Sequence, residues 1–111
     1  MNEERKDLLD RMVRRIVAEV GPEQIFLFGS WAKGEERADS DLDLLVVERD
    51  EFGPARSRRA EMARVWGALS GFGVPVDVLL FSRAEIERHR GAINHVAARA
   101  LREGRMLYDR G

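Results

Sequence analysis

Residues 25–30, IFLFGS, and residues 40–47, SDLDLLVV, decide the fold of this chain. In each stretch an apolar run of four residues meets small or acidic residues at one end. Short apolar runs bounded by turn residues are typical of buried strands. We therefore predict two central strands, at 25–28 and 41–47. The polar residues 30–38 form the turn between them, with room for one helical turn.

The segments around these strands carry helical patterns. Residues 3–20 repeat apolar side chains at three- and four-residue spacing, with Asn2 placed to cap the start and Gly21 to end the helix. Other helices are predicted at about 55–70, after a capping box at 82–85, and at about 92–103, and other strands at 74–81 and 106–108. The predicted fold class is therefore α/β (α+β), a small mixed β-sheet of three to four strands packed with helices.

Length and composition limit the classes of function. The chain has 111 residues, which is near the commonest domain size, and we expect a single domain over 1–111. Its net charge of −1 is too acidic for a general nucleic-acid binder. It has no apolar run long enough for a membrane span and no apolar signal region. Because it also lacks cysteine, it has no disulfide or thiolate metal site, and we expect a cytoplasmic protein.

Three aspartates stand in or beside the predicted strands. Asp41 and Asp43 are two residues apart, so a strand points both carboxylates to one face. Asp77 interrupts the apolar run 74–81, where an unpaired charge is costly. Carboxylates on one face usually bind a cation or share a proton. Since only oxygen ligands are available, the expected cation is a hard one such as Mg²⁺.

A glycine and a serine end the first predicted strand. Gly29 allows a phosphate to approach the backbone closely, and the Ser30 hydroxyl with neighbouring N–H groups can hold phosphate oxygens. Lys33 lies in the same turn and can add a positive charge. The turn therefore predicts a phosphate-binding site next to the aspartates.

The residues GSWAKG at 29–34 and SDLDL at 40–44 resemble the signature of the polymerase-β-type nucleotidyltransferase superfamily, and are most similar to its minimal (MntA-like) branch. The resemblance implies the nucleotidyltransferase fold and transfer of a nucleoside monophosphate, AMP from ATP, to a hydroxyl. It implies nucleotide binding by Gly29, Ser30, Lys33 and Ser40. It also implies that catalysis and the binding of two Mg²⁺ ions fall to Asp41, Asp43 and Asp77. Many relatives have arginine where this chain has Lys33. A lysine would contact phosphate as a point charge, whereas an arginine would use two parallel N–H donors.

The resemblance also implies a partner. MntA-like proteins are antitoxins that attach AMP to a HEPN-domain ribonuclease, typically on tyrosine. Two alternatives stay open: a module of the same fold that neutralises its partner by contact alone, and a small-molecule (aminoglycoside-like) nucleotidyltransferase. In a chain this short, the acceptor site must be shallow or completed by a partner or by a second copy, so a homo-oligomer is also open.

Other side chains have simpler expected roles. Trp66 and Phe72 are expected in the core, and Trp31 is open between simple packing and stacking on a base or partner. His89 and His95 are six residues apart, which is no helical-face spacing, and are expected to be solvated or structural. A solvated helix face, with nucleotide or partner contact as the alternative, is expected for Arg56, Arg58, Arg59 and Arg64.

Overall fold

The structure, a computed structural model, describes residues 2–35, 37, 40–89 and 96–111. Its elements are α1 (Glu3–Val20), β1 (Gln24–Phe28), α2 (Gly29–Lys33), β2 (Leu42–Glu48), α3 (Arg58–Leu69), β3 (Val76–Ser82), α4 (Arg83–His89), α5 (Val96–Glu103) and β4 (Arg105–Asp109). The predicted α+β class with a small mixed sheet is confirmed. The first part of the helix predicted at 92–103 lies outside the described residues.

The four strands form one mixed sheet in the order β3-β2-β1-β4. β1 is antiparallel to both of its neighbours, whereas β2 and β3 are parallel. Parallel neighbours need a long crossover connection, which α3 supplies here. The two strands predicted from residues 25–47 are the central pair of this sheet.

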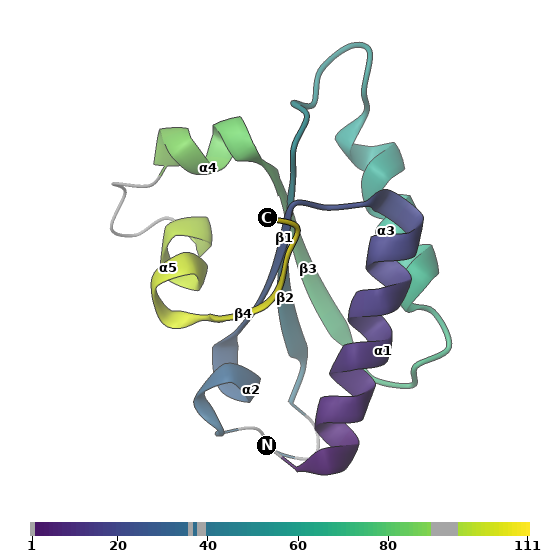
Figure 1. The fold of residues 1–111 in the computed structure, drawn as a ribbon, viewed down its shortest axis with the longest axis vertical. Helices are drawn as coiled ribbons and strands as arrows, with labels where there is room; N and C mark the ends of the chain where they lie inside the picture. Colours follow the sequence, from purple (N-terminus) through teal and green to yellow (C-terminus); the bar gives the residue numbers. More distant parts are fainter. Residues whose placement is uncertain (1, 36, 38–39, 90–95) are drawn as a thin grey trace.

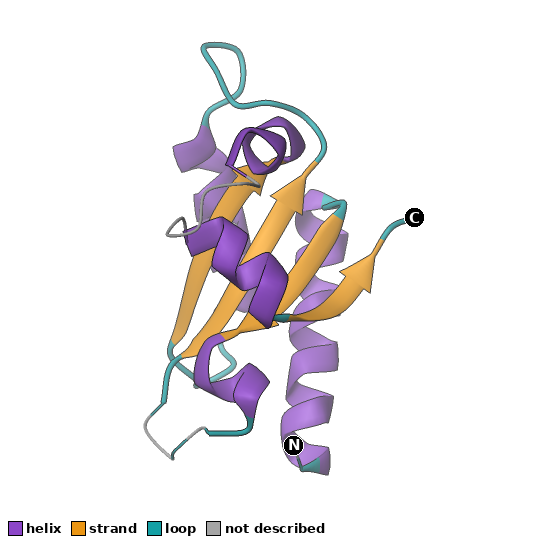
Figure 2. Ribbon diagram, turned by 90° about the vertical axis from the view of Figure 1, so that its left-hand side faces the viewer, coloured by secondary structure: helices purple, strands orange, loops and turns teal. Residues whose placement is uncertain are grey.

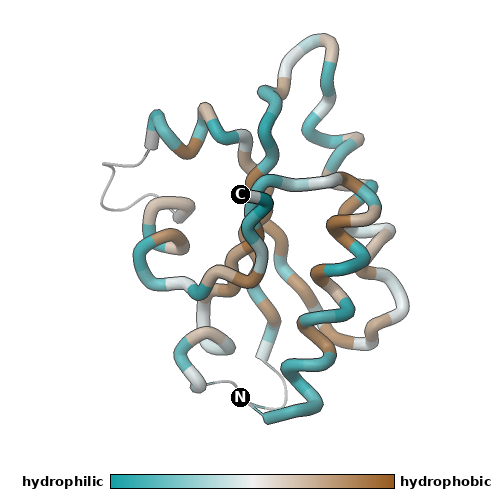
Figure 3. Tube along the Cα trace, in the orientation of Figure 1, coloured by the Kyte–Doolittle hydropathy of each residue, from teal (hydrophilic) through white to brown (hydrophobic). Residues whose placement is uncertain are grey.

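Helices cover both faces of the sheet (Figures 1 and 2). α1 and α3 lie on one face, and α4, α5 and α2 lie on the other side (Figure 1). Hydrophobic residues gather along the strands and on the side of α1 that faces them (Figure 3). Within the described residues, no helix combines the length and the apolar character that crossing a bilayer requires.

Alternation along β2 divides the core into two layers. Leu42, Leu44 and Val46 belong to the cluster packed with α1 and α3. Leu45 and Val47 belong to the cluster that includes Ile86 of α4 and Ala97 and Ala100 of α5. Because side chains alternate along a strand, Asp43 falls on the second face, the one that carries α5.

Local capping signals set several element boundaries. The Asn2 side chain accepts from Arg5 N at 2.8 Å, and Gly21 ends α1 in the left-handed region. The predicted capping box is present, with Ser82 N donating to Glu85 Oε1 at 2.9 Å and Glu85 N donating to Ser82 Oγ at 3.2 Å. α3 begins at Arg58 rather than at 55, because the Ser57 side chain caps Ala60 N.

The prediction that Trp66 lies in the core is wrong. Its side chain is 43% exposed, whereas Val65 and Leu69 of the same helix are buried. α3 presents only a narrow stripe to α1 and the sheet, and Trp66 lies outside it. Phe72 packs partly against the core, and its ring lies beneath the guanidinium groups of Arg11 and Arg15.

Most of the arginines predicted on a solvated helix face are paired with carboxylates. Arg56 precedes α3 and bonds both Glu48 and Glu61, which are buried. The others form ion pairs at the edges of the helix, Arg58 with Glu85 and Arg64 with Glu61 and Glu19. The solvated-face interpretation therefore fails for Arg56, whose side chain is 29% exposed and contacts two buried carboxylates, whereas Arg59 and Arg64 are exposed as predicted and Arg58 is half-buried.

Glu48 and Glu61 form a buried carboxyl pair. Burial is the largest cause that raises the pKa of Glu48 to about 7, followed by its hydrogen bond with Glu61, against the opposing effect of Arg56. The same hydrogen bond lowers the pKa of Glu61. Among the described residues no donor reaches Glu48 Oε2. A proton on Glu48 accounts for this, because it turns that carboxyl into a donor.

We expect Glu48→Gln to flatten the dependence of stability on pH. Folding favours protonated Glu48, so the wild-type free energy of unfolding should fall as the pH rises from about 4.5 to about 7. The amide keeps a donor and never ionises. The variant should therefore match the wild type near pH 4, below the pKa of the unfolded side chain, and be more stable by about 1–3 kcal/mol at pH 8. Urea unfolding at the two pH values, with exposed Glu35→Gln as control, measures this; equal gains at both would contradict it.

Candidate functional site

The register of the parallel pair places Asp43 and Asp77 side by side. Asp43 of β2 pairs with Asp77 of β3, one strand spacing away, and both side chains point to the same face of the sheet. Asp41 lies one residue before β2 and is exposed. The sheet topology thus brings together two of the three predicted carboxylates, Asp43 and Asp77. The third, Asp41, lies two residues before Asp43 in the chain.

Electrostatics link the three aspartates. Burial is the largest cause that raises the pKa of Asp43, and the charges of Asp77 and then Asp41 raise it further. A group whose pKa is raised in this way is held charged at neutral pH at a cost to the fold. Relief by a cation or by a proton is the chemistry that this arrangement favours.

Gly29 lies directly against the Asp43 carboxylate. A Cβ at position 29 would come within 2.2 Å of Asp43 Oδ2, and the backbone φ of Gly29 is +73°. Both observations require glycine at this position: there is no space for a Cβ atom, and the positive φ is unfavourable for residues that have one. Phe28, one residue earlier, pairs with Asp43 across β1 and β2. The end of β1 therefore delivers the Gly29–Ser30 turn to the aspartates.

The remaining predicted nucleotide-binding residues lie around this turn. Ser30 is half-buried in α2, and its carbonyl accepts from Glu35 N at 2.9 Å. Lys33 is exposed at the end of α2. The Ser40 hydroxyl accepts from Arg37 N at 2.7 Å, so Ser40 also holds the connection that leads to Asp41.

Trp31 is a packing residue. Its side chain is 5% exposed, and its indole N–H donates to the Ser40 carbonyl at 3.4 Å. The Arg5 guanidinium covers the ring at 5.1 Å from the centroid. Of the two interpretations that the sequence left open, the structure therefore supports packing. The His89 side chain and all of His95 lie outside the described part of the chain.

The three aspartates are the ligand type for a hard cation and lie near one another, but their carboxylates are not close enough together to bind one ion. In the part of the chain that the structure describes, no three acidic or histidine side chains gather closely enough to hold a metal ion. Asp41 and Asp77 are exposed, so their side chains can rotate toward Asp43 within nanoseconds. Oxygen donors on adjacent strands are the ligand type that Mg²⁺ prefers.

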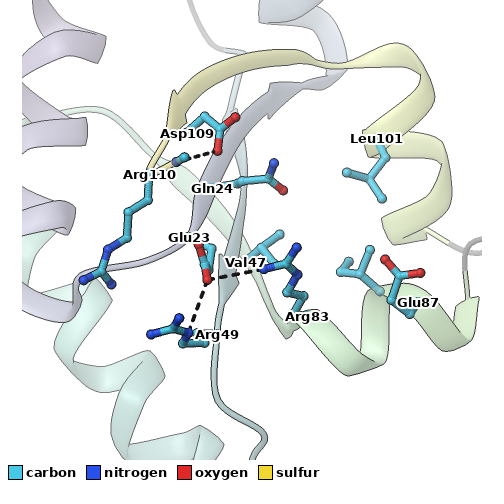
Figure 4. Close-up of a pocket in the computed structure, with 11 residues that line it drawn as sticks. Glu23, Gln24, Val47, Arg49, Arg83, Glu87, Leu101, Asp109 and Arg110 are labelled. Carbon is cyan, nitrogen blue, oxygen red and sulfur yellow. Dashed lines mark hydrogen bonds and ion pairs between the residues drawn. The ribbon is translucent and has the colours of Figure 1, made fainter.

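Two cavities lie on the same side of the sheet. One, of about 170 Å³, lies beside the turn and is lined by Phe28, Gly29, Lys33, Arg99, Ala100 and Glu103. The other, of about 580 Å³, lies at the opposite end of the strands, where Glu23 bridges Arg49 and Arg83 at 3.6 and 3.5 Å (Figure 4). Four strand residues, or roughly 13 Å, separate Val47 in that cavity from Asp43. The smaller cavity is therefore the one next to the aspartates.

Sequence reasoning missed Arg99 and Glu103 as neighbours of the turn. They are four residues apart on one helix and form an ion pair at 3.8 Å. Such a pair is common on solvated helices and carries no signal of a site by itself. Their position beside the Gly29–Ser30 turn becomes apparent only from the packing of α5 against β1.

The family of the chain follows from comparison with known proteins. A nucleotidyltransferase domain model matches residues 9–105, which include the turn and all three aspartates. The chain belongs to this family. The predicted resemblance is thus confirmed, and the four-stranded mixed sheet is the nucleotidyltransferase fold.

Several solved structures are similar. A proposed nucleotidyltransferase from Sulfolobus solfataricus is 21% identical with a TM-score of 0.61, over 94% of this chain and 79% of that one. A toxin-antitoxin structure with AMP-PNP is 23% identical with a TM-score of 0.51, over 88% and 71% of the two chains. A proposed minimal nucleotidyltransferase is 33% identical over 91% and 86%, with a TM-score of 0.49. No curated protein matches the chain.

Proposed function

We propose that this nucleotidyltransferase moves AMP from ATP to a hydroxyl group of a partner protein, with Mg²⁺ as the cofactor. The observation that carries the proposal is the contact between Gly29 and Asp43, beside Asp77. It places a turn suited to phosphate next to paired carboxylates suited to a cation. A triphosphate chelated to Mg²⁺ needs both features at one point.

Each residue of this group has a distinct proposed role. Gly29 and Ser30 hold the outer phosphates, with Lys33 adding charge, while Ser40 fixes the connection to Asp41 and binds at the same edge. Asp41, Asp43 and Asp77 are the proposed ligands of two Mg²⁺ ions. When bound, the ions neutralise the phosphates and favour attack on the α-phosphorus. Asp77, exposed at the edge strand β3, is also placed to accept the proton of the attacking hydroxyl.

The fold of the described residues and one similar structure support a proposal for the partner. The described residues provide a sheet with helices and no separate acceptor-binding lobe. A shallow site of this kind suits a large acceptor that brings its own surface. One of the similar structures is a toxin-antitoxin with AMP-PNP. We therefore infer an antitoxin role, with a HEPN-domain ribonuclease as the acceptor protein.

The position of the transferred phosphorus tests the reaction type. The chain and the protein that co-purifies with it are incubated with Mg²⁺ and ATP labelled at the α- or the γ-phosphate. Label from the α-position should become attached to the partner, and label from the γ-position should leave as pyrophosphate. Transfer of γ-label would indicate a kinase. Binding of the partner with no transfer of either label would favour neutralisation by contact alone.

A further inference from the structure

The cavity beside Gly29 has an apolar floor and a charged rim. Phe28 and Ala100 line it from β1 and α5, and Gly29 forms its inner edge. Lys33 stands on the α2 side, and Arg99 with Glu103 stands on the α5 side. The charged side chains that line the cavity therefore sum to one positive charge, right beside the turn proposed to hold phosphate.

Gly104 explains why α5 lies so close to this turn. A Cβ at position 104 would come within 2.3 Å of the Ala100 carbonyl oxygen and 2.7 Å of the Leu27 carbonyl oxygen. The absence of a side chain lets the end of α5 rest on the backbone of β1. β4 then continues the chain with Arg105 paired to Leu27. Both ribbon views show α5 next to α2 (Figures 1 and 2).

Arg99 is held in place only loosely. Its guanidinium lies 3.8 Å from Glu103, and the two side chains are 58% and 45% exposed. An exposed pair at this distance contributes little to stability. A phosphate group can therefore replace Glu103 as the partner of Arg99 at small cost, and it offers stronger, charge-assisted hydrogen bonds.

The size of the cavity limits the part of a nucleotide that it can accept. Its volume of about 170 Å³ is well below the roughly 300–1,000 Å³ of pockets that enclose whole ligands. It can hold one or two phosphate groups or one base, but not both. The positive charges of Lys33 and Arg99, and the contact with Gly29, favour phosphate groups over a base as the occupant of the cavity.

We propose that Arg99 is a nucleotide-binding residue that contacts the terminal phosphates from the α5 wall, opposite Lys33. This inference rests on the proposed function, because the triphosphate must be held at Gly29 and Ser30. It adds a second cation to the phosphate site, from a helix far away in the sequence. It also gives Glu103 a role, since its carboxylate competes with phosphate for Arg99.

Binding of AMP-PNP and of AMP, each with Mg²⁺, tests the inference by calorimetry without any catalytic step. Arg99→Ala should weaken AMP-PNP binding by about tenfold to a hundredfold and AMP binding by less than about twofold. Glu103→Gln should strengthen AMP-PNP binding by about two- to threefold, because it removes the competing carboxylate. Arg102→Ala, on the same helix but outside the cavity lining, should leave both affinities unchanged.

The outcomes separate this inference from the proposed function. If the wild type binds AMP-PNP and Arg99→Ala binds it equally well, only the role of Arg99 is overturned. Equal weakening of AMP and AMP-PNP would place Arg99 against the part that both ligands share, the nucleoside and its α-phosphate, and would also overturn the inference. If the wild type binds no triphosphate, the proposed function fails, and this inference fails with it. Arg99→Gln with an unchanged melting temperature guards against a folding effect.

Discussion

Asp43→Asn is expected to remove AMP transfer and at the same time to stabilise the folded chain. Asp43 is the partly buried member of the aspartate group, and burial with two like charges raises its pKa. The amide cannot serve as an anionic ligand, so transfer should fall by more than about a hundredfold. It also removes a charge that opposes folding, so the free energy of unfolding should rise by about 1 kcal/mol at pH 7, a figure reduced for partial exposure.

The pH dependence of the free energy of unfolding shows why the variant should be more stable than the wild type. The raised pKa means that the folded chain holds the Asp43 proton more tightly than the unfolded chain does. Wild-type stability should therefore fall as the pH rises above about 4, the range in which the unfolded side chain ionises. Urea unfolding at several pH values measures the gap between wild type and variant. Asp10→Asn, on the exposed face of α1, is the control and should change neither property.

Gly29→Ala is expected to damage both the fold and the reaction. Alanine at φ +73° is strained, and its Cβ would meet Asp43 Oδ2 at 2.2 Å. The strain should cost about 1–3 kcal/mol, and the carboxylate must turn away from its place beside Asp77. Transfer should therefore fall nearly as far as in Asp43→Asn, although all three aspartates remain.

Gly34→Ala provides a matched control for this substitution. Gly34 has nearly the same φ, +71°, but no atom of the described residues lies within 4 Å of the position of an added Cβ. It should lose stability through strain alone and keep most of its transfer activity. Thermal unfolding and labelled AMP transfer, measured on both variants, separate the two effects. Equal activity in the two variants would show that contact with Asp43 has no part in function.

Much of the fold was predictable because its signals are local. The apolar runs after Glu23 and after Asp41 are short, buried and bounded by turn residues, and they became β1 and β2. The capping box at Ser82 fixed the start of α4 in the same way. The alternation of β2 also placed Asp43 on one face before any tertiary information was available.

What could not be predicted depends on contacts between distant elements. Trp66 has helical spacing with Met62 and Leu69, but the limited width of the α3 interface leaves it exposed. The pairing of Glu48 with Glu61 needs α3 to pack over the end of β2. Arg99 reaches the turn only because Gly104 lets α5 approach β1. No single segment carries these relations.

The intact mass of the partner protein tests the central claim most directly. The protein that binds this chain is isolated, incubated with ATP and Mg²⁺, and weighed after treatment with the wild type or with a chain carrying Asp41→Ala and Asp43→Ala. We predict a gain of one or more AMP units with the wild type and no gain with the variant. A gain that persists without the two aspartates would contradict the account, because the transfer would then arise elsewhere.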